Sequence, residues 1–171
     1  MWEIADLTVL HRYSSLSPYY GVYGSVPEPV TVQTVGWLGD RVPTTGELPA
    51  ECIERLFDAY EAGMFEPWGG LGPHICEVCL RENGVTDYDG VIELSLLQRL
   101  VSPAVHSRGR TIQVYGHGHH FVRLGNRVFV CPVLILHYIL DHGYRPPTDF
   151  LDAVRAGNFI RKEDVPARRT L

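Results

Sequence analysis

The sequence lacks long apolar runs, an excess of basic residues and a phosphate-binding loop. None of its hydrophobic stretches approaches the roughly 20 residues that a membrane-spanning helix needs. Its first residues, MWEIADL, do not show the basic and then apolar order of a signal peptide. Its 15 Lys and Arg against 20 Asp and Glu give a net charge of −5, whereas proteins that grip nucleic acid through phosphates are usually basic. We therefore expect a cytoplasmic protein without a membrane segment, and we do not expect nucleic acid as its partner.

Cysteine is also scarce. The chain has four cysteines, and in the cytoplasm these are not expected to form two disulfides, so a close pair of thiols favours metal binding or redox chemistry. Such a pair is Cys76 and Cys79, separated by two residues. A thioredoxin-like motif needs a strand before the pair and a helix that starts at it, and the glycine-rich approach at residues 69–73 fits neither. We therefore interpret the pair as a metal-binding knuckle.

Matching donors occur on a helix predicted further along the chain. His137 and His142 are five residues apart, and Cys-x2-Cys followed by His-x4-His supplies the donors of a closed tetrahedral zinc site. Helical residues five apart are rotated by about 140° net, so the two rings converge if the helix loosens at its last turn, which Gly143 permits. We predict that one Zn²⁺ is held by Cys76, Cys79, His137 and His142.

Other histidines offer alternatives. His74 lies two residues before Cys76 and could replace a helix histidine. If one of the four donors were absent, the metal would keep a water and the site would be open for hydrolase or lyase chemistry, with Asp141 and Glu77 as proton acceptors. On a strand, His117 and His119 share one face, where they could bind a second metal or act as acid and base. The alternative interpretation of residues 116–120 is a polar hairpin tip rich in His and Gly.

Hydrophobic periodicity and turn residues predict an α+β fold. The sequence predicts a small antiparallel sheet with three to four helices around a zinc knuckle. Its expected strands are residues 7–10, 30–38, 111–115, 119–124 and 127–131, the last three as a meander. Its expected helices are residues 49–60, 93–101, 133–142 and 147–156, with a polar turn over residues 81–90. We expect a single domain, residues 1–171, with an irregular arm at 1–29 and a polar tail at 158–171.

Two resemblances follow from these motifs. The Cys-x2-Cys and Leu-x2-His-x4-His spacing resembles a Cys2His2 zinc finger, although such fingers place about a dozen residues between the pairs and here residues 80–136 intervene. The chain also has Val-Gly-Trp-Leu at 35–38, Gly-x-His-x-Cys-x-x-Cys at 72–79, and Pro-x-Leu-Ile-x-His-Tyr-Ile-x-x-His-Gly-Tyr-x-Pro-Pro-x-x-Phe at 132–150. Over most of residues 30–156 it is similar to a group of small uncharacterised bacterial proteins frequent in actinobacteria. That resemblance supports the metal site and implies no reaction.

The functional prediction is a zinc-binding cytoplasmic protein whose closed site is structural. We expect it to act as an accessory or protein-interaction module, such as an immunity or inhibitor partner, and its partner to be another protein. The alternative is a small zinc-dependent hydrolase or lyase with an open metal position.

Overall fold

The structure is a computed structural model that describes residues 5–10, 31–67, 74–85, 93–161 and 164. Its helices within these ranges are α1 (Ala50–Glu61), α2 (Glu77–Glu82), α3 (Leu94–Val101), α4 (Ile135–His142) and α5 (Thr148–Arg155). Its strands there are β1 (Val9–Leu10), β2 (Thr31–Thr34), β3 (Glu66–Pro67), β4 (Ala104–Ser107), β5 (Arg110–Gln113), β6 (Gly118–Leu124), β7 (Arg127–Pro132) and β8 (Phe159–Ile160). The α+β class is therefore confirmed. Over the same ranges, no helix combines the length and the apolar composition that crossing a bilayer would require.

The main sheet is mixed rather than wholly antiparallel. Its strand order is β1-β2-β7-β6-β3, with β8 also paired to β6, and β2 runs parallel to β7 while the other pairs are antiparallel. The predicted strand over residues 30–38 is shorter in the structure, because Gly36 adopts a φ of 72° that ends the extended backbone. Most of the predicted N-terminal arm, residues 1–29, lies outside the described residues, as does most of the polar tail.

The predicted three-stranded meander is not formed. Strand β5 pairs with β4 in a separate hairpin, and it does not pair with β6. Between β5 and β6 the chain instead bonds to the last residue of α3 and to the segment after it, through Gly116 N–H to Val101 O and Val114 N–H to Pro103 O. These bonds take the backbone out of one sheet before it enters the other, so only β6 and β7 form the expected hairpin.

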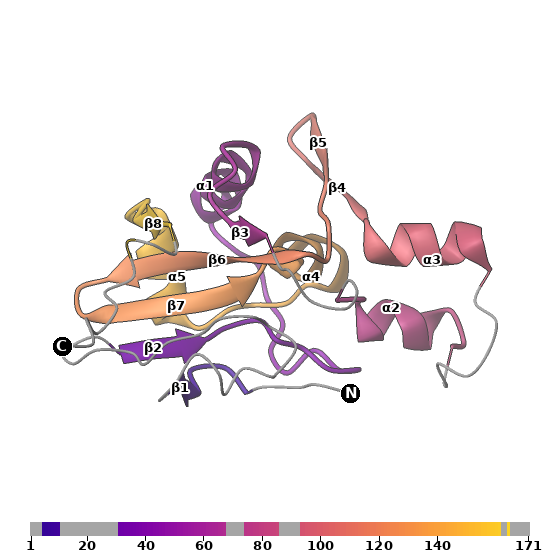
Figure 1. Cartoon of the computed structure of the whole chain (residues 1–171), viewed down its shortest axis with the longest axis horizontal. Coiled ribbons are helices and arrows are strands. Elements are labelled where there is room, and N and C mark those ends of the chain that lie inside the picture. Colours follow the sequence, from indigo (N-terminus) through magenta and orange to yellow (C-terminus); the bar gives the residue numbers. More distant parts are fainter. Residues whose placement is uncertain (1–4, 11–30, 68–73, 86–92, 162–163, 165–171) are drawn as a thin grey trace, which may run out of the picture.

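One face of the main sheet carries the core that positions the site. Val122 and Phe129 pack there with apolar side chains of three helices, and all are fully or almost fully buried. The residues that these helices and the N-cap of α4 contribute to the cluster include Leu56, Phe57, Leu134, Ile135, Leu136, Phe150, Leu151 and Val154. Figure 1 shows α4 and α5 behind the sheet and α2 and α3 beyond one end of it. Burial of each such side chain contributes about 1.5–3 kcal/mol, which fixes α4 firmly against the sheet.

The C-terminal end of α4 has a further anchor. Asp6 accepts hydrogen bonds from Gly36 N–H at 2.8 Å and from the Tyr144 hydroxyl at 2.7 Å. Gly143, with a φ of 65°, ends the helix, and Tyr144 N–H then donates to Tyr138 O at 2.9 Å. Asp6 thereby ties Tyr144, two residues after the end of α4, to Gly36, so two distant parts of the chain meet there.

Helix α2 was not predicted. The sequence predicts a polar turn over residues 81–90, whereas the structure has a six-residue helix from Glu77 to Glu82. Val78 and Leu80 are buried and anchor it. Six residues are too few for a helical period to be recognised in a sequence.

Gly116 is required by a close approach of two backbones. A Cβ built at this position would lie 1.9 Å from His74 O, and His74 N–H donates to Gly116 O at 2.7 Å. The segment that leads into the knuckle therefore runs directly against the start of β6.

We predict that Gly116→Ala lowers the free energy of unfolding by about 3 kcal/mol, because a backbone atom cannot give way as a side chain can. Denaturant unfolding measures this. Gly125→Ala is the control, since Gly125 has open space but a φ of +61°, and we expect about 1 kcal/mol for it. A smaller loss for Gly116→Ala than for Gly125→Ala would contradict the close approach.

Candidate metal centre

The knuckle is the start of α2. Cys76 is the N-cap residue, and its sulfur accepts a hydrogen bond from Cys79 N–H at 3.4 Å. Leu80 N–H donates to Cys76 O, which closes the first helical turn. Both sulfurs therefore lie at one end of a short helix, on the same side. A helix does begin at this pair, contrary to our argument against a redox motif, while the glycine-rich approach at residues 69–73 falls outside the described part of the chain.

Helix α4 supplies the two imidazole rings. The chain remains helical as far as His142, which is the last residue of α4 before Gly143. The rings of His137 and His142 lie nearly perpendicular, with centroids 4.7 Å apart, and their Nε2 atoms are 3.1 Å apart. Two histidines five positions apart thus converge on one point at the end of the helix.

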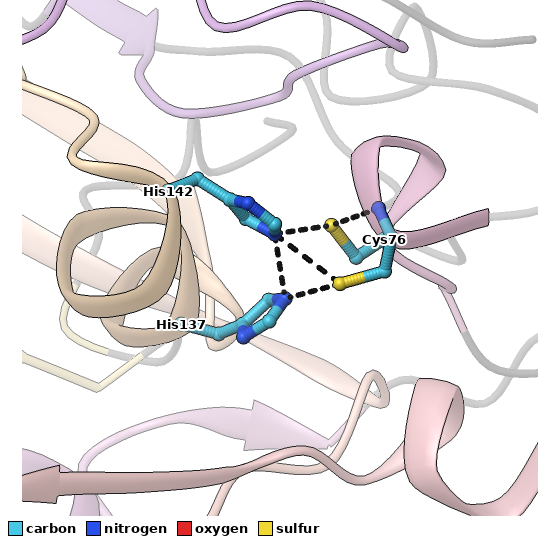
Figure 2. Close-up of side chains that lie close together, drawn as sticks. Cys76, His137 and His142 are labelled. Atoms are coloured by element: carbon cyan, nitrogen blue, oxygen red, sulfur yellow. Dashed lines mark hydrogen bonds between the residues drawn. The ribbon is translucent and has the colours of Figure 1, made fainter. Parts of the chain in front are cut away.

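The four predicted donors meet at that point. Cys76 Sγ lies 3.3 Å from His142 Nε2, and Cys79 Sγ lies 3.2 Å from the Nε2 atoms of both histidines. Figure 2 shows the ring of His142 reaching toward the sulfur of Cys76, with the ring of His137 beside it. All four ligand atoms lie within 4.8 Å of one another, and around a tetrahedral zinc ion a sulfur and a nitrogen are ~3.6 Å apart. These four residues are close enough to bind one metal ion.

The hydrogen bond with Asp141 determines which nitrogen of His137 is available to a metal ion. The carboxylate of Asp141 accepts from His137 Nδ1–H at 2.6 Å, so in the neutral ring the lone pair is on Nε2 and faces the other donors. The side chains of His137 and His142 are only 4% and 6% exposed. Nitrogen and sulfur lone pairs that face one another away from water repel, unless positive charge lies between them.

Without a metal, protons supply that charge. The pKa of Cys79 is lowered, first by the hydrogen bond from the Cys76 thiol and then by those from His137 and His142, while the pKa of Cys76 is raised by the same bond and by burial. Burial alone would lower the pKa of His137, but its hydrogen bonds with Asp141 and Cys79 raise it to about 9. A metal ion must displace these protons, so its affinity falls as pH falls.

His74, the predicted substitute ligand, lies elsewhere. Its Nε2 is 2.8 Å from the Tyr138 hydroxyl, and its ring meets Trp37 edge-on with centroids 6.0 Å apart. Desolvation lowers its pKa to about 4. His74 therefore ties the approach to the knuckle onto α4, one residue beyond His137, and the structure does not bring it into the donor cluster.

The histidines of the run at residues 116–120 do not join a donor cluster either. His117 is half-buried and precedes β6, and His119 is buried with its ring edge-on to Phe121 at 5.0 Å. Among the described residues, the Cys76-Cys79-His137-His142 group is the one cluster of at least three ligand side chains. The glycines of the run have a backbone role, since a Cβ at Gly118 would lie 2.7 Å from Glu66 O.

Sequence analysis missed the carboxylates that support the histidines. Asp141 was considered only as a proton acceptor for an open site, whereas the structure shows it bonded to the far nitrogen of His137. Glu82 lies 3.8 Å from the Nδ1 of His142. The i, i+4 spacing of His137 and Asp141 on one helix was the available signal.

Fold and site together define an α+β protein with a Cys2His2 cluster that could hold a metal ion. The chain belongs to the family described as a domain of unknown function, DUF7919, which matches residues 4–155. That match includes both halves of the donor cluster. No curated protein and no solved structure matches the chain.

Outside the donor cluster, His120 of β6 is a buried histidine. Its Nδ1–H donates to Met64 O at 2.7 Å, and its Nε2 has no hydrogen-bond partner among the described residues. The rings of Tyr60, Phe65 and Phe159 surround it at centroid distances of 6.4, 6.0 and 5.8 Å. This burial lowers the pKa of His120 from 6.5 to about 4.

We predict that His120 makes stability depend on pH. The part of the unfolding free energy that depends on neutral His120 is fully present above pH 6.5. It is lost as pH falls to about 4, because His120 binds a proton more readily in the unfolded chain than in the folded one. The loss amounts to about 3 kcal/mol. His120→Asn keeps a donor for Met64 O and removes the titration, so its unfolding free energy should fall less over this range. Parallel pH profiles for both proteins would refute the prediction.

Proposed function

We propose that the cluster binds zinc and that the site is closed and structural. Thiolate sulfur together with neutral imidazole nitrogen is the donor set of structural zinc sites, and four protein ligands fill the tetrahedron. The observation that carries the proposal is the convergence of the Nε2 atoms of His137 and His142 on the sulfurs of Cys76 and Cys79.

The role of zinc would be to cross-link two elements. Cys79 and His142 are 63 residues apart in sequence, and α2 is too short to be stable by itself. Zinc, when bound, would supply strong bonds to both sulfurs and both nitrogens. The chain's own contribution is to hold the sulfurs on the first turn of α2 and the rings on the last turns of α4.

We further propose that the protein is cytoplasmic, of bacterial and actinobacterial type, and acts as an accessory module that binds another protein. One observation supports a protein partner. The large apolar side chains of Leu94 and Tyr115 are 68% and 52% exposed, and exposed apolar groups supply contact area where a partner binds. They lie at either end of α3, since Tyr115 precedes Gly116, whose N–H bonds to Val101 O. An inhibitor or immunity partner would have such a surface.

A second candidate is an enzyme that uses Cys79 as a nucleophile. Cys79 Sγ, His137 and Asp141 form a line of contacts at 3.2 and 2.6 Å, as in a Cys-His-Asp triad. The triad does not need a second thiol and a second imidazole at the same point, whereas zinc needs both, so the geometry favours zinc. The zinc-dependent hydrolase or lyase alternative needs an open metal position, and here four side chains are available to close it.

We predict that the purified protein contains about one zinc per chain. X-ray absorption should show two sulfur and two nitrogen ligands. The double variant Cys76→Ser, Cys79→Ser should contain no zinc. At a free zinc concentration 100 times the dissociation constant, binding stabilises the fold by about 2.7 kcal/mol. A chelator should therefore lower the melting temperature of the wild type and leave that of the double variant unchanged.

The control is Cys52→Ser, which removes a buried thiol outside the cluster and should keep its zinc. A wild-type protein that binds no zinc, and whose melting temperature a chelator does not change, would end this proposal.

The triad and the zinc site also differ in thiol reactivity. With zinc bound, we predict that neither knuckle thiol reacts rapidly with iodoacetamide, because the metal holds both sulfurs. After chelation Cys79 should be alkylated first, since it is partly exposed and its pKa is lowered, whereas Cys76, Cys52 and Cys131 are buried. Mass spectrometry identifies the site. Rapid alkylation that zinc does not suppress would favour the nucleophile.

A further inference from the structure

The two histidines of the metal centre are supported unequally. The Nδ1 of His137 donates to the Asp141 carboxylate at 2.6 Å, which is a short charge-assisted hydrogen bond. The nearest carboxylate to the Nδ1 of His142 is that of Glu82, at 3.8 Å, which is beyond hydrogen-bonding distance. The side chains of Asp141 and Glu82 are 41% and 55% exposed, so it is the distance to the ring, rather than exposure, that separates the two carboxylates.

This difference affects the strength of each metal bond. A carboxylate that accepts the Nδ1 proton fixes the tautomer and the orientation of the ring, and it makes Nε2 a stronger donor. His137 has this support and His142 does not. The bond from the metal to His137 should therefore be the stronger of the two.

The position of each ring in α4 points the same way. His137 lies within the helix, whereas His142 is its last residue and is followed by Gly143 in a left-handed conformation. His142 and Gly143 also line an open groove of about 490 Å³. Its other lining residues are Thr45, Gly46, Glu47, Leu48, Ile53, Ile139 and Leu140. The groove therefore borders His142 and none of the other three donors.

We propose that Asp141 is a positioning residue that makes His137 the permanent ligand, and that His142 is the exchangeable one. This inference rests on the proposed zinc site. In the exchange, His142 Nε2 would leave the metal, and a water oxygen or the nitrogen of a small imidazole would take its place. No electron is transferred and the other three bonds remain. A bound metal would then have, for as long as His142 is displaced, one position open to a ligand from outside the chain.

The first test compares two variants with the same change of charge. Asp141→Asn and Glu82→Gln each remove one negative charge near the centre, and zinc affinity is measured by competition with a chelator at pH 7.5. We expect Asp141→Asn to weaken binding about 10–100-fold, Asp141→Ala at least as much, and Glu82→Gln less than about 3-fold. Equal effects of Asp141→Asn and Glu82→Gln, or no effect of Asp141→Asn, would overturn the inference.

The outcomes separate the two proposals. If the wild type binds no zinc, the proposed function fails. If it binds zinc and Asp141→Asn behaves like Glu82→Gln, only the positioning role fails. Circular dichroism of the metal-free variants shows whether the substitution has disturbed the fold, which an effect on the metal bond alone would leave unchanged.

The second test exchanges the ligands themselves, with Co²⁺ as the probe because its visible spectrum reports its ligands. We expect His142→Ala to retain tetrahedral Co²⁺ and added imidazole to shift its spectrum. His137→Ala should lose at least 10-fold more affinity for Co²⁺. Equal losses in the two variants, or a spectrum of His142→Ala that imidazole does not change, would contradict an exchangeable position at His142.

Discussion

The convergence of four lone-pair donors on one buried point is the constraint on which the rest of the structure depends. Sulfurs from the start of α2 and nitrogens from the end of α4 face one another at 3.1 to 3.3 Å, an arrangement that requires positive charge between them. Every element that fixes α4 or α2 therefore also fixes the site. Asp6 does so from the N-terminal segment, and the sheet core does so through the apolar face of α4.

Contacts other than the donors themselves align the two elements. His74 meets the Tyr138 hydroxyl, and its backbone runs against Gly116 without room for a Cβ. These contacts hold His74, two residues before Cys76, against α4 and against the residues that precede β6. A metal ion then needs to order few residues, which lowers the entropy lost on binding.

Residue type and spacing predicted much of this arrangement, and tertiary contacts determined the rest. Helices α1, α4 and α5 were predicted because their apolar residues repeat with the helical period over at least eight residues. The donor residues could be selected because few residue types bind zinc. The pairing of β4 with β5 could not be predicted, because strand partners depend on contacts distant in sequence. The role of Gly116 was equally invisible, since the residue that excludes its side chain is 42 positions away.

The same geometry gives two opposite chemistries, depending on what occupies the centre. With protons there, the pKa of Cys79 is lowered and that of His137, which a carboxylate orients, is raised, and that combination activates a thiol. With a metal there, the sulfur lone pairs are engaged and the thiolate is protected. Because Asp141 supports His137 in both states, its presence does not distinguish them. Cys76 and His142 do, since a nucleophile has no use for either, and the fold brings both to the same point.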